Sequence, residues 1–229
     1  MKKNIMKIIL LLTVFGIIAI GCHKYIKDDL ENPSEQYLNT LSTQISKTTE
    51  FKTFVSNIIV IRKLAVASAY TSSFLYQKNP GSSEFVKSIY NLKTNDKEGL
   101  LKALNSQFKK GENINNLLLE NVELSAKIRK EYPQLLNLQP EKRDLVITNA
   151  IQKTIKNLPV QQIATNFASD PYSVYVDDIS DNPCITSCRN QYYVNAGVCA
   201  LLVETVFGAA VCFVGASLGL SACKGGCPA

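Results

Sequence analysis

Apolar residues recur every three or four positions through residues 34–168, and this spacing predicts amphipathic α-helices. The longest stretch runs from Phe51 to Ala65, and we expect it to form a central helix that ends near Asn79-Pro80-Gly81. The pattern therefore predicts an all-α protein whose body is a multi-helix bundle. The stripe-forming residues of its first half are Tyr37, Leu38, Leu41, Ile45, Phe51, Phe54, Val55, Ile58, Ile61, Leu64 and Ala65.

Capping residues mark where the early helices should begin. Asn32-Pro33-Ser34-Glu35 joins a capping residue, a proline suited to the first helical position and an acid, so it predicts a helix start. Phe85, Ile89 and Leu92 predict a short helix after the central one. Asn95 and Glu98 are spaced to cap the next helix, which we expect Gly111 to close.

Prolines bound the later helices. One helix is expected from about Ile114 to Tyr132, because Pro133 cannot continue it. Pro140 suits the first turn of another that runs to Leu158. A last turn or two is expected near Val160–Phe167, and the polar, acidic stretch 169–183 then reads as a linker.

Six cysteines crowd into the last part of the chain, at Cys184, Cys188, Cys199, Cys212, Cys223 and Cys227. The gaps between them contain three, ten, twelve, ten and three residues, so the spacing is its own mirror image. Pairing the outermost with the outermost (184–227, 188–223, 199–212) makes every pair symmetric about one point, the bond between Thr205 and Val206. An antiparallel hairpin has this property, and we favour this nested order among the fifteen possible pairings.

Helical geometry supports the hairpin. At about 100° per residue, a step of four turns a side chain by roughly 40° and a step of eleven by roughly 20°, so the three cysteines of each arm share one face. In a strand, a step of eleven would place Cys188 and Cys199 on opposite sides. Disulfides need Cα atoms about 5.5 to 6 Å apart, closer than most helix pairs, and we expect Gly208, Gly215 and Gly219 to allow that approach, with Ala196 and Tyr192 facing them.

The hairpin is unusually apolar, because Val198–Leu220 contains one charged residue, Glu204. Three arrangements could cover this apolar surface. The hairpin could dock on the helical body, one arm could span a membrane, or the segment could be a membrane-active or partner-binding peptide. Glu204, Gly208 and the cysteines count against a spanning helix.

The amino terminus has the layout of an export signal. Lysines in Met1–Lys7 precede an apolar run from Ile8 to Ile20, about 13 residues long and too short for a permanent membrane span. Ala19-Ile20-Gly21-Cys22 resembles the lipobox that the lipoprotein signal peptidase cleaves, although its first position departs from the usual leucine. The resemblance implies removal of residues 1–21 and a lipid on Cys22.

The residues after Cys22 extend this resemblance. Lys27-Asp28-Asp29 looks like the export tag of surface lipoproteins in one Gram-negative phylum, and it implies an outer-membrane protein facing outward. The alternative is a charged tether with no signalling role. On this interpretation residues 22–33 are the tether, 34–168 the helical domain, 169–183 the linker and 184–229 the six-cysteine hairpin.

Charge and composition narrow the function classes. Removing residues 1–21 takes away Lys2, Lys3 and Lys7, so the formal net charge of +6 falls by three, and nucleic-acid binding finds no support. The one histidine is His23, beside the expected anchor, which excludes a histidine-based catalytic centre or zinc site in the body. No phosphate-binding glycine loop is present, and the acids of 169–183 lack calcium-loop spacing. We therefore expect no enzyme activity, cofactor or metal; an enzyme would need two buried carboxylates beside one cleft.

Residues 184–229 also resemble bacteriocin-like domains, including the halocin type, in their cysteine number, alanine and glycine richness and apolarity. That resemblance implies a precursor whose tail is released by proteolysis, and the lipidated amino end departs from it. The sequence thus supports two hypotheses. In the first, a non-enzymatic surface lipoprotein uses the hairpin for interaction or display, with a protein or membrane target. In the second, the chain is a bacteriocin-like precursor.

Overall fold

The computed structural model describes residues 33–68, 84–93, 96–158 and 182–227, and within these ranges every regular element is a helix. The expected signal, lipobox and export tag, the helix end near residues 79–81, the last turns near 160–167 and residues 169–181 of the linker lie outside the described residues. Pro183, expected to end the linker, begins a helix instead. Nine helices occupy the described ranges: α2 (Glu35–Lys47), α3 (Thr49–Ser68), α5 (Glu84–Tyr90), α6 (Lys97–Gln107), α7 (Gly111–Glu131), α8 (Gln134–Asn137), α9 (Pro140–Asn157), α11 (Pro183–Leu202) and α12 (Val206–Gly225).

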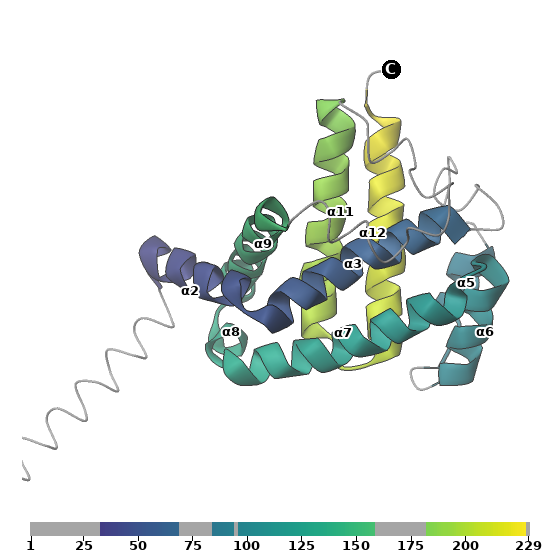
Figure 1. Cartoon of the computed structure of the whole chain (residues 1–229), viewed down its shortest axis with the longest axis horizontal. Helices are drawn as coiled ribbons and strands as arrows, with labels where there is room; N and C mark the ends of the chain where they lie inside the picture. The colour runs from purple at the N-terminus through teal and green to yellow at the C-terminus, as the bar shows by residue number, and fades with distance from the viewer. Residues whose placement is uncertain (1–32, 69–83, 94–95, 159–181, 228–229) are drawn as a thin grey trace, which may run out of the picture.

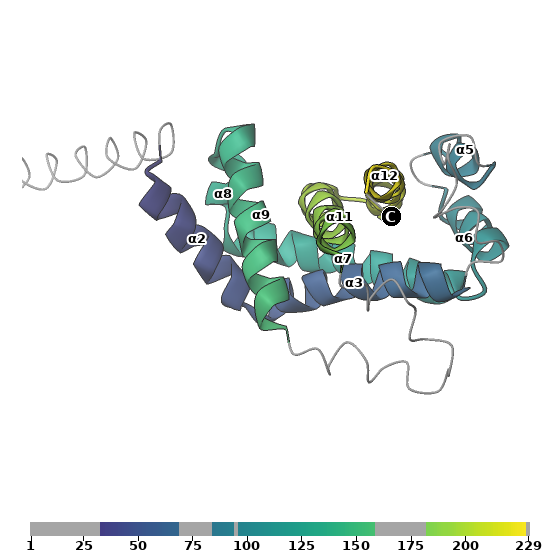
Figure 2. The same cartoon turned by 90° about the horizontal axis from the view of Figure 1, so that it is seen from above.

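The body and the hairpin are arranged in two layers. α3 and α7 lie side by side and form a platform, with α2 and α9 at one end and α5 and α6 at the other (Figure 1). Seen from above, α11 and α12 stand across this platform between the two end pairs (Figure 2). The predicted all-α class, with a bundle and a terminal helical hairpin, is confirmed.

Helix starts are set by short polar side chains, at positions next to those expected. Ser34, not Asn32, caps α2, because its hydroxyl accepts a hydrogen bond from the Tyr37 amide at 3.2 Å. Asp96, not Asn95, caps α6 through a carboxylate bond to the Gly99 amide at 2.8 Å. In both helices the cap is the residue whose side chain accepts a hydrogen bond from a free amide of the first turn.

Gly111 begins α7 instead of closing α6, which ends at Gln107. A Cβ built on Gly111 would lie 2.5 Å from the backbone carbon of Leu104, so the glycine lets the start of α7 lie against the backbone of α6. The expected helix end before Pro133 agrees with the end of α7, and the expected start at Pro140 agrees with the start of α9. The short helix α8 between them was not predicted.

Lys153 of α9 joins this helix to α2 through hydrogen bonds to oxygen atoms of α2. The Lys153 ammonium donates to the Asn39 side-chain oxygen at 2.7 Å, the Thr43 hydroxyl at 2.7 Å and the Ser42 hydroxyl at 2.9 Å. The Asn39 carbonyl oxygen is a fourth acceptor at 3.2 Å, so four acceptors share the three N–H groups of this lysine. Leu38, Leu41 and Ile45 of α2 are buried as predicted, whereas Leu145 of α9 is 44% exposed.

Candidate functional site: a disulfide-stapled hairpin docked on the body

The six cysteines form the three nested disulfides that the mirrored spacing predicts. Cys184 is bonded to Cys227, Cys188 to Cys223 and Cys199 to Cys212, with Cα–Cα distances of 5.7, 5.7 and 5.5 Å. Asn182 caps the first arm through the Cys184 amide at 2.9 Å, and Thr205 caps the second through the Gly208 amide at 3.0 Å. Two capped helices are therefore joined by two disulfides at the open end of the hairpin and by one near its tip.

The expected role of the seam glycines is wrong for Gly215 and Gly219, and Gly208 packs on the connection before it, where a Cβ would lie 2.9 Å from Cβ of Val203. A Cβ on Gly215 would meet nothing within 4 Å, and one on Gly219 would meet the Asn195 amide nitrogen at 4.0 Å, so neither glycine is needed for close approach. Ala196 and Tyr192, expected to face them, are instead buried, at 3% and 1% exposure, and both line a cavity together with residues of the body. The side chains of Tyr192 and Ala196 therefore lie against the body.

Gly197 is the hairpin glycine that allows close packing. A Cβ there would lie 2.5 Å from Cδ1 of Ile151 in α9 and 3.4 Å from Cδ1 of Ile58 in α3. Ile151 is fully buried, so it has little room to move. Gly197 thus lets α11 settle between α3 and α9.

Substitution of glycine by alanine is expected to have opposite effects at positions 197 and 215. Gly197→Ala is expected to destabilise by about 1 to 3 kcal/mol through overpacking, less the helix propensity that alanine adds. Gly215→Ala fills open space in a helix interior and is expected to stabilise by about 0.5 to 1 kcal/mol. Urea unfolding of the two variants checks the signs, and a destabilised Gly215→Ala would show that this side of α12 is not open.

The inward face of the hairpin carries the aromatic contacts that join it to the body. Tyr192 and Phe213 face each other across the two arms, edge to face, with ring centroids 6.4 Å apart. Phe213 then meets Phe108, which follows α6, at 6.5 Å, and Phe108 meets Phe85 of α5 at 5.4 Å. A single cluster of buried apolar side chains therefore includes the body and the hairpin, so the docked arrangement is the one observed.

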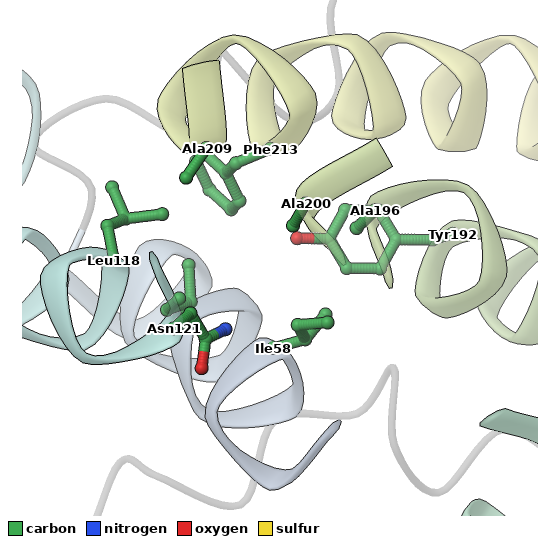
Figure 3. A pocket seen from close by; sticks show the side chains of 9 residues that line it. Ile58, Leu118, Asn121, Tyr192, Ala196, Ala200, Ala209 and Phe213 are labelled. Carbon is green, nitrogen blue, oxygen red and sulfur yellow. The ribbon is translucent and has the colours of Figure 1, made fainter. Parts of the chain in front are cut away.

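A small cavity lies where α3, α7, α11 and α12 meet. Its volume is about 20 Å³, room for about one water molecule. Figure 3 shows the Tyr192 phenol and the Asn121 side chain directed toward this space among apolar neighbours. Neither the Tyr192 Oη nor the Asn121 Oδ1 makes a hydrogen bond of good geometry. Burial raises the pKa of Tyr192 far above its usual range, more than Arg62 and Ser217 lower it, so the phenol stays neutral.

Arg62 of α3 ties a second tyrosine of the hairpin to the body. It is 3% exposed and donates to the Tyr193 hydroxyl at 3.4 Å, with its guanidinium carbon 5.9 Å from the Tyr193 ring centroid. A cation at this distance from an aromatic face is attracted to it. The contact adds a polar anchor beside the apolar one.

Arg129 of α7 closes the carboxyl end of α11. Its Nη1 donates to the carbonyl oxygens of Leu201 at 2.6 Å and Val203 at 3.0 Å, and lies 3.4 Å from the Ser125 hydroxyl. The last carbonyls of a helix lack partners within it and carry partial negative charge, so a cation there is favourable. This side chain fixes the tip of the hairpin to the platform.

Loss of Arg129 is expected to loosen the tip. Arg129→Met should lower the free energy of unfolding by about 1.5 to 3 kcal/mol, since hydrogen bonds from a charged group are removed and the carbonyls are left partly buried. The neighbouring Lys130→Met is the control, because Lys130 is exposed and expected to change stability by less than about 0.5 kcal/mol. Equal effects of the two substitutions in thermal unfolding would contradict the capping role.

A groove of about 200 Å³ lies beside the tip. Its acidic residues are Asp96 and Glu204, and both are exposed. The buried pair of carboxylates that an acid-based enzyme would need is therefore not found at this groove. Its lining residues are Asp96, Lys97, Leu100, Leu119, Val122, Glu204, Thr205, Val206 and Phe207.

The outward side of the hairpin is uncharged. Asn195 and Cys199 of α11 and Gly215 and Gly219 of α12 are exposed there. Within the described helices, α12 is long and apolar enough to cross a membrane, yet 53% of its apolar stretch is buried in the fold, as in a core helix. The docked hairpin therefore buries one face of each arm against the body and exposes the other face to solvent.

The structure brings together the six predicted cysteines, while Cys22, Lys27, Asp28 and Asp29 lie outside the described residues. The sequence reasoning missed Arg62, Arg129 and Gly197, and no local spacing signal marks them, because their partners lie far away in the chain. Comparison with protein-family models, curated protein sequences and solved structures found no match.

Proposed function

We propose that the chain is a non-enzymatic, lipid-anchored protein of the outer cell surface, and that its docked hairpin serves interaction or display. The lipobox-like Ala19–Cys22 and the Lys27-Asp28-Asp29 tag support the location. The observation that carries the role of the hairpin is its two-sidedness, because one side completes the core and the other is uncharged and exposed.

The disulfides suit such a display. They hold the outward face as one rigid surface, so a partner would not have to order it on binding. Between Asn190 and Cys223 the only charge is Glu204 at the tip, so the outward face offers contact by its shape and by uncharged groups. A protein or a membrane surface fits this chemistry better than a nucleic acid does.

Metabolic labelling tests the anchor. Palmitate is expected to label the wild-type chain and not Cys22→Ala, and protease added to intact cells is expected to remove the hairpin from the wild type. Labelling that persists in Cys22→Ala, or a hairpin that resists protease until the cells are broken, would contradict the proposed anchor or orientation respectively.

Site-specific cross-linking tests the display. A photoreactive amino acid at exposed Gly215 is expected to give adducts on intact cells, whereas the same residue at Leu136, exposed on α8 of the body, is the matched control. Similar adducts from both positions, or none from position 215, would argue against a dedicated outward face.

A second candidate function is a bacteriocin-like precursor, and the length and apolarity of α12 favour it. A peptide of residues 184–229 in its oxidised form is expected to permeabilise lipid vesicles on this alternative. On the main proposal the peptide is expected to be poorly soluble and inactive, because separation exposes the inward side chains of Tyr192 and Phe213.

A further inference from the structure

Four cysteine sulfurs gather at the open end of the hairpin, away from the tip. The disulfides 184–227 and 188–223 are adjacent there, and the sulfurs of Cys188 and Cys227, which are not bonded to each other, lie 3.7 Å apart. The sulfurs of Cys184, Cys188 and Cys227 all lie within 4.8 Å of one another. Cys223 joins this group through its bond to Cys188.

This spacing matches a tetrathiolate metal site. Zinc binds thiolate sulfur at about 2.3 Å in a tetrahedron, so neighbouring ligands stand about 3.8 Å apart. One non-bonded pair already has that separation. Disulfide sulfurs are generally about 2.05 Å apart. After reduction, the sulfurs of each pair would therefore have to move apart by less than about 2 Å, roughly what a change of side-chain torsion supplies.

The backbone at this end supports such an adjustment. Cys184 and Cys188 are one helical turn apart in α11, and Cys223 is in the last turn of α12. Cys227 follows the helix end after Gly225 and Gly226, and a Cβ on Gly225 would meet nothing within 4 Å. Three ligands therefore stand on helices, and the fourth lies in the turn just beyond one.

The charged residues nearest these cysteines in the chain are positive. Within residues 182–227 the charged side chains are Arg189, next to Cys188, Lys224, next to Cys223, and Glu204 at the far tip. The amino end of α11 adds the partial positive charge of a helix start beside Cys184. Cys223 is exposed, so reductants and metal ions have access from solvent.

We infer that the reduced hairpin binds one soft, tetrahedral metal cation of the zinc class through Cys184, Cys188, Cys223 and Cys227. A dithiol reductant supplies two electrons and two protons to each of the two disulfides and is itself oxidised to a disulfide. The metal ion then displaces four protons as the four thiols become thiolate ligands. The expectation of no metal site applies to the oxidised chain, in which these sulfurs are bonded in pairs.

The two states stabilise the hairpin in different ways. In the oxidised state two covalent bonds close the open end, and in the reduced state the metal closes it, so metal binding is coupled to folding of the hairpin. Thiolate sulfur selects zinc-class ions over hard cations such as Mg²⁺. This inference stands apart from the proposed surface role, which depends on the outward face and the anchor.

Cobalt and zinc titrations test the inference on the full-length chain in detergent. Cys199→Ser/Cys212→Ser keeps the four proposed ligands, and Cys184→Ser/Cys227→Ser, which retains four other cysteines, is the matched control. After reduction, the first variant is expected to bind one Co²⁺ with the absorption bands of a tetrathiolate site and to release it to one Zn²⁺. Loss of an outer-shell partner lowers metal affinity by roughly 10- to 100-fold. The control lacks two ligands, so its Co²⁺ affinity is expected to fall by more than this.

Circular dichroism of the same samples adds a structural readout. Zinc is expected to restore helicity lost on reduction in the Cys199→Ser/Cys212→Ser variant and not in the control. No stoichiometric Co²⁺ binding by the reduced Cys199→Ser/Cys212→Ser variant would overturn the inference. Equal affinity of the two variants would overturn it as well, since it would show that any set of free thiols suffices.

Discussion

Reduction of all three disulfides in the presence of a chelator is expected to remove most of the stability of the hairpin. The bonded pairs are separated by 43, 35 and 13 residues along the chain, and closing loops of these sizes restricts the unfolded chain. Each bond then contributes roughly 2 to 4 kcal/mol. Three such contributions are comparable with the whole stability of a typical domain, about 5 to 15 kcal/mol.

Urea unfolding followed by circular dichroism measures this loss, with the oxidised chain as reference. Hydrogen exchange of residues 184–227 should rise more than that of the α2 and α9 pair, because the latter is also held by Lys153. An unchanged unfolding midpoint after complete reduction and alkylation would show that the disulfides add nothing to the fold.

Truncation of Tyr192 is expected to have the next largest effect. Tyr192 is among the largest fully buried side chains and contacts both Phe213 of the other arm and Tyr193 of its own. Tyr192→Ala removes the ring and enlarges the cavity beside Asn121, so it should cost about 3 to 5 kcal/mol. Equilibrium unfolding of the oxidised variant measures the cost.

Tyr192→Phe separates the ring from its hydroxyl. Because the Tyr192 Oη makes no hydrogen bond of good geometry, its removal is expected to change stability by less than about 1 kcal/mol in either direction. A loss as large as that of Tyr192→Ala would mean that the hydroxyl, and not ring packing, holds the hairpin on the body.

Much of the fold follows from local signals in the sequence. Apolar residues at helical spacing locate the helices, and Pro133 and Pro140 mark two boundaries, since proline cannot continue a helix interior but suits its first turn. The mirrored cysteine spacing carries more information, because nested pairing and a shared helical face restrict each other. The three disulfides of the hairpin were therefore predictable from six positions.

The parts that were not predictable depend on contacts between distant segments. Gly215 and Gly197 look alike in a helical pattern, and only the position of Ile151 makes one of them necessary. Arg129 has the pattern of an ordinary helix-end cation, yet its acceptors lie 72 and 74 residues further along the chain. The predicted cap of α6 was wrong because Asn95 and Asp96 are chemically similar neighbours, which the sequence alone does not distinguish.

Non-reducing peptide mapping of the purified chain tests the nested hairpin most directly. Cleavage after Arg189, Glu204 and Lys224 isolates Cys199 and Cys227, leaves Cys184 with Cys188 on one peptide, and leaves Cys212 with Cys223 on another. Fragmentation of the linked peptides then distinguishes the two cysteines that share each peptide. We expect the links 184–227, 188–223 and 199–212. Free thiols in protein recovered from outside the cell, or any crossed link, would contradict two antiparallel helices bonded face to face.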